Sequence, residues 1–250
     1  KRQHEVIKML DLTLDKDVIE DKETIGGGGN SRIWESGVYD TIIEMVTIEE
    51  SSGGATAVNV TLKSTDKDSK VFPIRDTFWI TSGKAKGQKT FYVDKAGKKH
   101  PLPGYTSANR LCIATEGKPL TEVVPTGEKK TINAYSWEAK KEIPVEKYVL
   151  TSLIGKPVQI AVQLFKRNKQ KPNASGVYED TAEVFESNEI RYFANAETKL
   201  SVGEMADGVA EATFMNEWDA KNKGTTIDKT NKNLQPAATA VTSAKASVFA

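Results

Sequence analysis

Residues 37–80 hold the pattern that most constrains the fold, because apolar and polar side chains alternate there in three successive segments. Residues 57–63 alternate cleanly, with Val58, Val60 and Leu62 on one side and Asn59, Thr61 and Lys63 on the other. Residues 71–80 place Phe72, Ile74, Phe78 and Ile80 on one side, and Arg75, Thr77 and Trp79 on the other. A period of two is typical of β-strands. We therefore predict a three-stranded antiparallel meander that begins with residues 37–48.

The remaining body continues this β pattern around one helix. We predict a helix over residues 107–117, a helical turn within 149–154, and strands at 130–137, 156–166 and 179–193. In the strand 156–166 the alternation predicts Val158, Ile160, Val162 and Leu164 inside, and Gln159, Gln163 and Phe165 outside. Three strands, a helix and two strands is the order of the oligonucleotide/oligosaccharide-binding (OB) fold. The predicted fold class is mainly β: an OB-fold-like Greek-key barrel of five to six strands with short helices.

Composition divides the chain into four parts. Residues 1–36 are expected to form an acidic arm with a hinge at the four glycines 26–29, since glycine leaves the backbone free. Residues 37–195 would form the OB-like domain, and residues 196–223 a C-terminal helix that starts at the capping-box pair Ser201 and Glu204. Residues 224–250 have little to bury and are expected to be a flexible tail. A phosphate-binding loop is excluded because no Gly-Lys-Ser/Thr follows the glycines.

The segment 83–105, GKAKGQKTFYVDKAGKKHPLPGY, is called the basic loop from here on. It holds six lysines and His100 against one acid, Asp94, and it carries the aromatic residues Phe91, Tyr92 and Tyr105. Lysines attract the phosphates of a nucleic acid, and flat rings stack on its bases. The loop therefore predicts binding of single-stranded DNA. The alternative is a solvated connection, because charged runs punctuated by glycine also occur as plain loops.

The overall charge conceals a strong segregation along the chain. The formal net charge is only +1, but residues 11–50 contain eleven acids and three bases, whereas residues 83–110 contain seven bases and one acid. A DNA strand responds to the local field rather than to the average. Near neutrality therefore does not argue against a nucleic-acid partner. Residues 166–176, KRNKQKPNASG, predict a second basic turn.

The candidate nucleic-acid-binding residues follow from these patterns. They are basic and aromatic side chains of the outward strand faces, the basic loop, the helix after it and the second basic turn: Lys63, Arg75, Trp79, Lys84, Lys86, Lys89, Phe91, Tyr92, Lys95, Lys98, Lys99, Tyr105, Arg110, Tyr135, Trp137, Lys166 and Arg167. For Trp79 the competing interpretation is an ordinary core residue, since tryptophan is usually well buried.

Other classes of function find little support in the sequence. The single cysteine, Cys112, excludes an internal disulfide and fits a reducing compartment, and two histidines leave no ligand set for zinc. No run of about 18 apolar residues predicts a membrane span. No carboxylate cluster of the kind that holds catalytic metals stands out. We expect a cytoplasmic protein that is not an enzyme and has no metal or cofactor.

Three segments add a resemblance to this interpretation: GVYDTIIEMVTIEE, DTFWITSGKAKGQKTFYVDKAGKKHPLPGY and SANRLCIATEGKPL. They resemble the single-stranded-DNA-binding proteins of lytic tailed bacteriophages, over roughly residues 37–195. The resemblance implies an OB-fold protein that coats exposed strands during phage DNA replication and recombination in the host cytoplasm, without sequence preference and often cooperatively. It also implies that Arg75, Trp79 and the basic loop form the binding groove.

The C-terminus departs from that family, whose members commonly end in an acidic tail that recruits replication partners. Residues 219–250 hold two acids and five lysines, so recruitment through such a tail is in doubt, and the acidic N-terminal arm is an alternative recruiter. Besides single-stranded DNA, the open partners are replication proteins, host RNA polymerase and a second copy of the chain; no membrane partner is expected. The alternative function is a β-rich phage structural or protein-interaction protein without affinity for single-stranded DNA.

Overall fold

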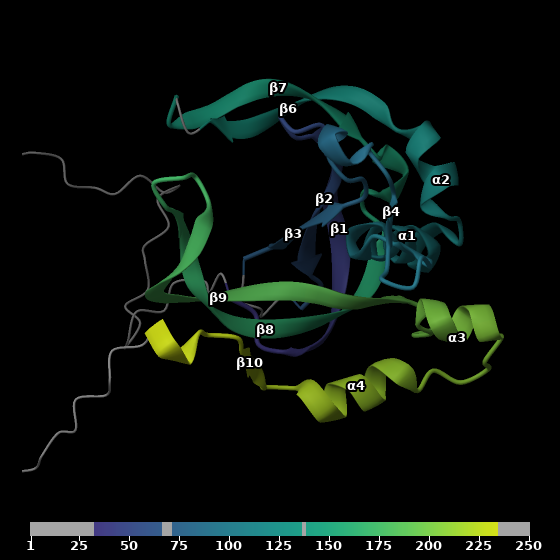
Figure 1. The fold of residues 1–250 in the computed structure, drawn as a ribbon. Helices are drawn as coiled ribbons and strands as arrows, with labels where there is room; N and C mark the ends of the chain where they lie inside the picture. Colours follow the sequence, from purple (N-terminus) through teal and green to yellow (C-terminus); the bar gives the residue numbers. More distant parts are fainter. Residues whose placement is uncertain (1–32, 67–71, 137–138, 235–250) are drawn as a thin grey trace, which may run out of the picture. The chain divides into compact units, whose positions relative to one another are not determined.

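The computed structural model describes residues 33–66, 72–136 and 139–234, and it is mainly β with short helices (Figure 1). One sheet runs in the order β10 (Thr226–Asp228), β8 (Pro157–Pro172), β1 (Gly37–Glu50), β2 (Thr56–Ser64) and β3 (Ile74–Trp79). β9 (Tyr178–Asn195) pairs with β8, and β7 (Lys141–Val149) pairs with β1 and with β6 (Glu128–Ser136). All of these pairs are antiparallel except β10 with β8.

The predicted meander is confirmed in β1, β2 and β3. Val58, Val60 and Leu62 are buried, while Arg75, Thr77 and Trp79 are exposed on the opposite side of the sheet. Phe72 was expected on the apolar side but is exposed, because it precedes the first ladder residue of β3 and the ladder does not hold it against the core.

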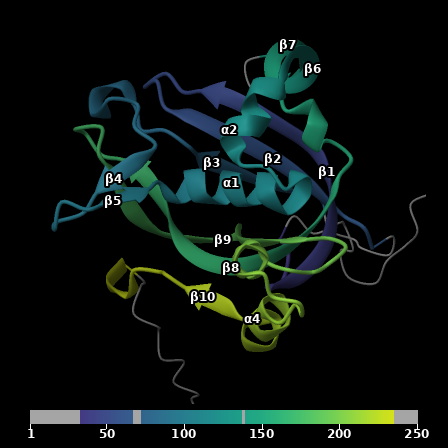
Figure 2. The same ribbon diagram turned by 90° about the vertical axis from the view of Figure 1, so that its right-hand side faces the viewer.

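The core lies between the inner face of this sheet and α1 (Pro103–Glu116), which buries Ala108, Leu111, Cys112 and Ala114. Figure 2 shows α1 with β2 and β3 on one side and β8 and β9 on the other, and contacts confirm that it packs on β3, β8 and β9. The predicted helix is confirmed, but it begins at Pro103, where the ring suits a first helical position. Tyr105 is therefore helical. After α1 come α2 (Leu120–Val123) and η2 (Val124–Thr126), and η3 (Thr151–Leu153) matches the predicted helical turn.

Within the described residues, the sheet is not closed into a barrel by a ladder between β3 and β9. Side chains connect these strands instead. The Asp76 carboxylate on β3 accepts a hydrogen bond from the backbone N–H of Ile190 on β9, at 3.1 Å, and Phe78 on β3 packs edge-on against Phe193 on β9, with ring centroids 6.0 Å apart. In place of the predicted Greek-key barrel, the described residues form an open sheet, and α1 packs on both β3 and β9.

Two β-hairpins extend from the sheet in Figure 1. The β6–β7 hairpin contains β7, a strand that the sequence did not predict because Pro144 and several charges interrupt its apolar pattern. The second hairpin, called the β8–β9 arm, comprises residues 166–186. Its first part was predicted as a turn, but β8 continues to Pro172, and the turn is confined to 173–176, where Asn173 Oδ1 accepts from the N–H groups of Ser175 and Val177.

The prediction for the outer side of β8 was wrong, because Gln163 and Phe165 are both buried. The chain after α4 returns along the edge of β8, where β10 pairs with Leu164, Phe165 and Lys166. Lys229, just after β10, lies over the Phe165 ring, with its ammonium group 4.4 Å from the ring centre. Gln163 donates to the Ser36 hydroxyl and to the Thr225 carbonyl. Residues 224–234, expected to be part of a flexible tail, are therefore packed on β8 and include η4 (Lys232–Leu234); residues 235–250 lie outside the described residues.

The C-terminal helix is two helices, α3 (Val202–Asp207) and α4 (Phe214–Asn222). The predicted capping box is confirmed: Ser201 and Glu204 bond each other's backbone N–H. Gly208 ends α3 with a φ of 65°, and Glu204 also accepts from the N–H groups of Thr213 and Phe214 at the start of α4. One carboxylate therefore holds the two helix ends together.

Ile33 to Ser36 belong to the body rather than to an arm. Trp34 is 1% exposed in the core, and its indole N–H donates to the Phe72 carbonyl at 2.8 Å. The glycine hinge and the rest of the predicted N-terminal arm lie outside the described residues. No helix in the described part of the chain is long and apolar enough to cross a membrane.

Candidate nucleic-acid interface

The outer face of β2 and β3 presents a tryptophan to solvent. Trp79 is 47% exposed, so its interpretation as a core residue is wrong. It lies on the same strand face as Thr77, whose hydroxyl donates to Asn59 Oδ1 on β2 at 2.8 Å. Arg75 and Lys63 are exposed further along this face. An indole beside polar and basic side chains offers a flat stacking surface with charges nearby.

The basic loop is folded rather than extended. It contains η1 (Lys84–Lys86) and a small hairpin of β4 (Phe91–Val93) and β5 (Lys99–Pro101). The Lys84 N–H donates to the Gly53 carbonyl, and Gln88 donates to the Gly54 carbonyl, both at 2.8 Å. Gly83 lies so close to Gly53 that an added Cβ would be 2.9 Å from its carbonyl oxygen. These contacts fix the loop to the turn between β1 and β2.

Asp94, the one acid of the loop, is used by the hairpin itself. Its Oδ1 accepts from the N–H groups of Ala96 and Lys98, and its Oδ2 lies 2.8 Å from His100 Nε2. The hydrogen bond from His100, together with those from Lys98 and Ala96, lowers the pKa of Asp94 below its usual value. The acid is therefore held as a turn-forming group and does not pair with the loop lysines.

All six lysines of the basic loop are exposed, but their surroundings differ. Lys84 pairs with Glu50 at 3.3 Å. Lys89 and Lys99 lie over the Phe91 ring. The remaining three have neither an ion pair nor a ring contact with any described residue and are called the free loop lysines: Lys86, Lys95 and Lys98. Mobile, unpaired ammonium groups are the kind that exchange counterions for phosphates.

The two aromatic residues of β4 are partly engaged within the hairpin. Tyr92 is 48% exposed and stacks on His100, with ring centroids 5.4 Å apart and an interplanar angle of 25°. Phe91 has the ammonium groups of Lys99 and Lys89 at 4.9 and 5.9 Å from its ring centre. Phe91 thus organises lysines around itself, while Tyr92 leaves about half of its surface for another ring.

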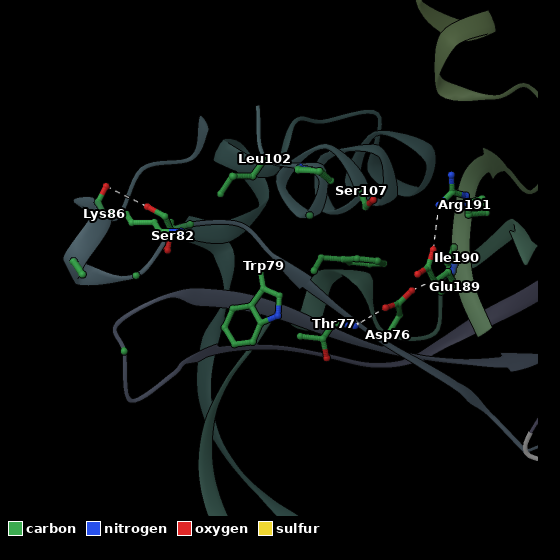
Figure 3. A pocket seen from close by; sticks show the side chains of 17 residues that line it. Asp76, Thr77, Trp79, Ser82, Lys86, Leu102, Ser107, Glu189, Ile190 and Arg191 are labelled. Carbon is green, nitrogen blue, oxygen red and sulfur yellow. Dashed lines mark hydrogen bonds and ion pairs between the residues drawn. The ribbon is translucent and has the colours of Figure 1, made fainter. Parts of the chain in front are cut away.

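A cavity of about 690 Å³ lies between the outer end of β3, the basic loop, the start of α1 and β9. Figure 3 shows Trp79 with Lys86 and Ser82 to one side of it and Glu189 and Arg191 to the other. Its volume is within the range of small-ligand pockets. A base or a nucleotide could therefore enter beside the exposed indole.

Close backbone packing positions this cavity. Gly104, near the start of α1, lies against Trp79: an added Cβ would be 2.4 Å from the Trp79 carbonyl oxygen and 2.5 Å from its nitrogen. Any side chain at position 104 would push the helix away from the strand. Because position 104 is glycine, α1 can lie directly against the Trp79 backbone and form the wall of the cavity beside the indole.

The far wall of the cavity carries two acids, Asp76 and Glu189, and one arginine, Arg191. Burial raises the pKa of Asp76, although backbone hydrogen bonds from Ile190 and Thr77 partly oppose it. Burial would also raise the pKa of Glu189, but hydrogen bonds and charge from Arg167 and Arg191 outweigh it, and the pKa is lowered. Glu189 is thus an anion that forms ion pairs with the guanidinium groups of Arg167 and Arg191. These two positive charges offset its repulsion of a phosphate. The sequence analysis missed Arg191, and a bulged strand position has no sequence signal that could have revealed it.

Of the predicted site residues that the structure describes, only Trp79 and Lys86 line this cavity. Arg75, Arg110 and Tyr105 have other surroundings. Arg75 lines a separate cavity with Phe72 and Asn188, and Arg110 lines another with Glu204 and Asp207. Tyr105 is partly buried against the core from the first turn of α1. The structure therefore gives Tyr105 a packing role, and it places Arg110 next to acids instead of beside the basic loop.

The bases at the start of the second basic segment lie close to acids of the neighbouring strand, β9. Arg167 forms an ion pair with Glu189 and lies over the Phe165 ring, at 4.5 Å from its centre. Lys166 is opposite Glu186 in the ladder. Both residues are therefore matched with acids of β9. Tyr135 lies in β6 on the other hairpin, its side chain is outside the described part, and Trp137 is wholly outside it.

Comparison with protein-family models finds no family that matches this chain, and comparison with curated proteins finds no significant relative. Among the described residues, no three acids, histidines or cysteines lie close enough together to hold a metal ion.

Proposed function

We propose that this protein binds single-stranded DNA without sequence preference and covers strands exposed during DNA replication and recombination, as do the bacteriophage proteins that residues 37–195 resemble. One observation carries the proposal: a half-exposed tryptophan, Trp79, borders a cavity that the lysine-bearing loop also lines. Aromatic stacking and unpaired lysines together are what sequence-tolerant binding of a single strand needs.

The strand order supports an OB-like interpretation of the fold. β1 pairs with both β2 and β8, α1 separates β3 from β8 in the chain, and β9 follows β8. In this interpretation β1, β2, β3, β8 and β9 are the five OB strands and α1 is their helix, with the β6–β7 hairpin as an insertion. The contact between β3 and β9 is then made by the Asp76–Ile190 hydrogen bond and by Phe78 against Phe193. In OB folds the ligand lies across the second and third strands, which here are β2 and β3, the strands that carry Lys63 and Trp79.

A tryptophan-fluorescence titration with oligo-dT at two salt concentrations tests the proposal. About six lysine–phosphate contacts predict a slope near −4 for log affinity against log salt, at about 0.7 per contact. Trp79→Phe should remove most of the quenching while keeping a stacking ring. Trp218→Phe is the matched control, because Trp218 lies on α4 against Tyr192, with ring centroids 6.4 Å apart. Association that is undetectable or insensitive to salt would reject DNA binding and leave the β-rich interaction protein as the explanation.

A further inference from the structure

The two strands of the β8–β9 arm carry opposite charges. Residues 166–171 of β8 contain four bases and no acid, and residues 179–189 of β9 contain five acids and no base. The ladder places Lys171 opposite Glu179, and Lys169 forms an ion pair with Glu183. The arm is therefore a ribbon with one basic edge and one acidic edge.

Both edges of the ribbon are open in the described part of the chain. On one edge of β8, β1 pairs as far as Val162 and β10 pairs as far as Lys166. Beyond Lys166, the only ladder partner of β8 among the described residues is β9. A two-stranded ribbon is marginally stable by itself, so a partner packed against one of its faces would stabilise it. The arm also exposes Val177, Tyr178 and Phe185, with Tyr178 65% exposed near the tip. An apolar tip and two charged edges favour a protein partner.

We propose that the β8–β9 arm is a self-association surface and that its partner is a second copy of this chain. In a two-fold pair whose arms stack face to face and point the same way, β8 of each copy lies over β9 of the other. Lysines then meet carboxylates in two identical contacts, as a two-fold interface requires. The opposite alignment sets lysines against lysines, so charge selects one arrangement. The contact does not depend on DNA, but a dimer would bring two copies of the proposed DNA site to one strand and raise avidity.

A simpler role for these charges is to hold the two strands of the arm together within one copy. Surface ion pairs contribute little to such stability. The two roles predict different behaviour when charges are exchanged between the strands, because exchange keeps every pair within the arm but changes what the arm presents to another copy.

Sedimentation velocity of the full chain at low and high salt, with three variants, tests the proposal. The acidic-arm variant carries Lys169→Glu and Lys171→Glu, the basic-arm variant carries Glu179→Lys and Glu183→Lys, and the swapped-arm variant carries all four. We expect wild type to dimerise at low salt and to dissociate at high salt. Each two-site variant should dimerise at least ~100-fold more weakly alone, because like charges then face each other, and the two variants should dimerise when mixed.

The swapped-arm variant separates the interface from folding of the arm. It keeps the intramolecular pairs, so it should dimerise with itself and fail to pair with wild type. Wild type that stays monomeric, or a swapped arm that pairs equally well with wild type, would overturn the proposal. Binding to a short oligo-dT is measured in parallel: a monomeric wild type that binds the oligonucleotide rejects only the arm contact, whereas a dimer that binds no DNA rejects only the proposed function.

Discussion

The basic loop and the 166–171 stretch of β8 have similar lysine-rich sequences and opposite surroundings. In the basic loop the single acid, Asp94, bonds its own turn and His100, and the free loop lysines are exposed, with no ion-pair partner in the described part of the chain. In β8 the bases lie along a ladder with the acids of β9, as Lys169 does with Glu183. The difference shows that lysine density along a chain does not measure surface potential; strand pairing decides which positive charges stay available.

Removing the free loop lysines should give the largest effect. Replacing Lys86, Lys95 and Lys98 by Ala removes about three phosphate contacts, which lowers the salt slope by about 2 and the affinity at 0.1 M salt by about 100-fold. Oligo-dT binding followed by fluorescence at several salt concentrations measures both quantities.

The matched control replaces by Ala three lysines that form ion pairs: Lys169, Lys199 and Lys232, whose partners are Glu183, Asp40 and Asp228. This change also removes three positive charges, so a purely global charge effect would weaken binding equally. We expect the slope and the affinity for a short oligonucleotide to change little. If both triple variants lose the same affinity and salt slope, then lysines with an ion pair and lysines without one do not differ in DNA binding.

Replacing the stacking surface should have the next largest effect. Trp79→Ala is expected to weaken oligo-dT binding by about 1–3 kcal/mol at fixed salt, since one base loses its aromatic partner. The salt slope should stay unchanged, because no phosphate contact is lost. Anisotropy of a labelled oligonucleotide measures this without relying on tryptophan emission. An unchanged affinity would show that Trp79 is exposed for another reason.

Substitutions at two glycines, one beside the basic loop and one in the β8–β9 arm, should differ in their cost to the free energy of unfolding. Gly104→Ala places a Cβ against the Trp79 backbone and should cost about 2 kcal/mol of the free energy of unfolding, through displacement of α1. Gly176→Ala, at the turn of the β8–β9 arm, meets no atom within 4 Å, and its cost of about 1 kcal/mol comes from a φ of 76°. Urea unfolding compares them. If Gly176→Ala lowers the free energy of unfolding more than Gly104→Ala does, then α1 can move away from the Trp79 backbone at little cost.

Acid should loosen the β4–β5 hairpin, and this is the smallest of the expected effects. The pKa of Asp94 is lowered from 3.8 in the folded state, so its contribution is present above that pH and is lost as the pH falls below it. The protection factors for amide exchange at Ala96 and Lys98, whose N–H groups donate to Asp94, should then fall relative to the intrinsic rate at each pH. In Asp94→Asn the same amides should lack this pH dependence; if they keep it, another group controls the turn.

Much of the architecture could be predicted because local patterns and tertiary packing agree. The alternation of Val58, Val60 and Leu62 matches a sheet with one buried face, and Ser201 with Glu204 forms the expected capping box. The outward direction of Trp79 followed from the same period of two. The prediction failed where distant segments pack on a strand: Gln163 and Phe165 have the sequence of an outer face, but Gln163 bonds Ser36 and Thr225, and Lys229 lies over the Phe165 ring.

The sequence by itself therefore determined the mainly β class, the faces of the central strands and the position of the basic loop, since these depend on neighbours in the chain. Only the tertiary structure decided which charges remain free, because the partners of Lys169 and Arg167 lie 14 and 22 residues away on β9. It also decided that Trp79 borders a cavity, since the close approach of α1 at Gly104 builds the wall beside it. Both outcomes depend on contacts between strands and helices that no local pattern encodes.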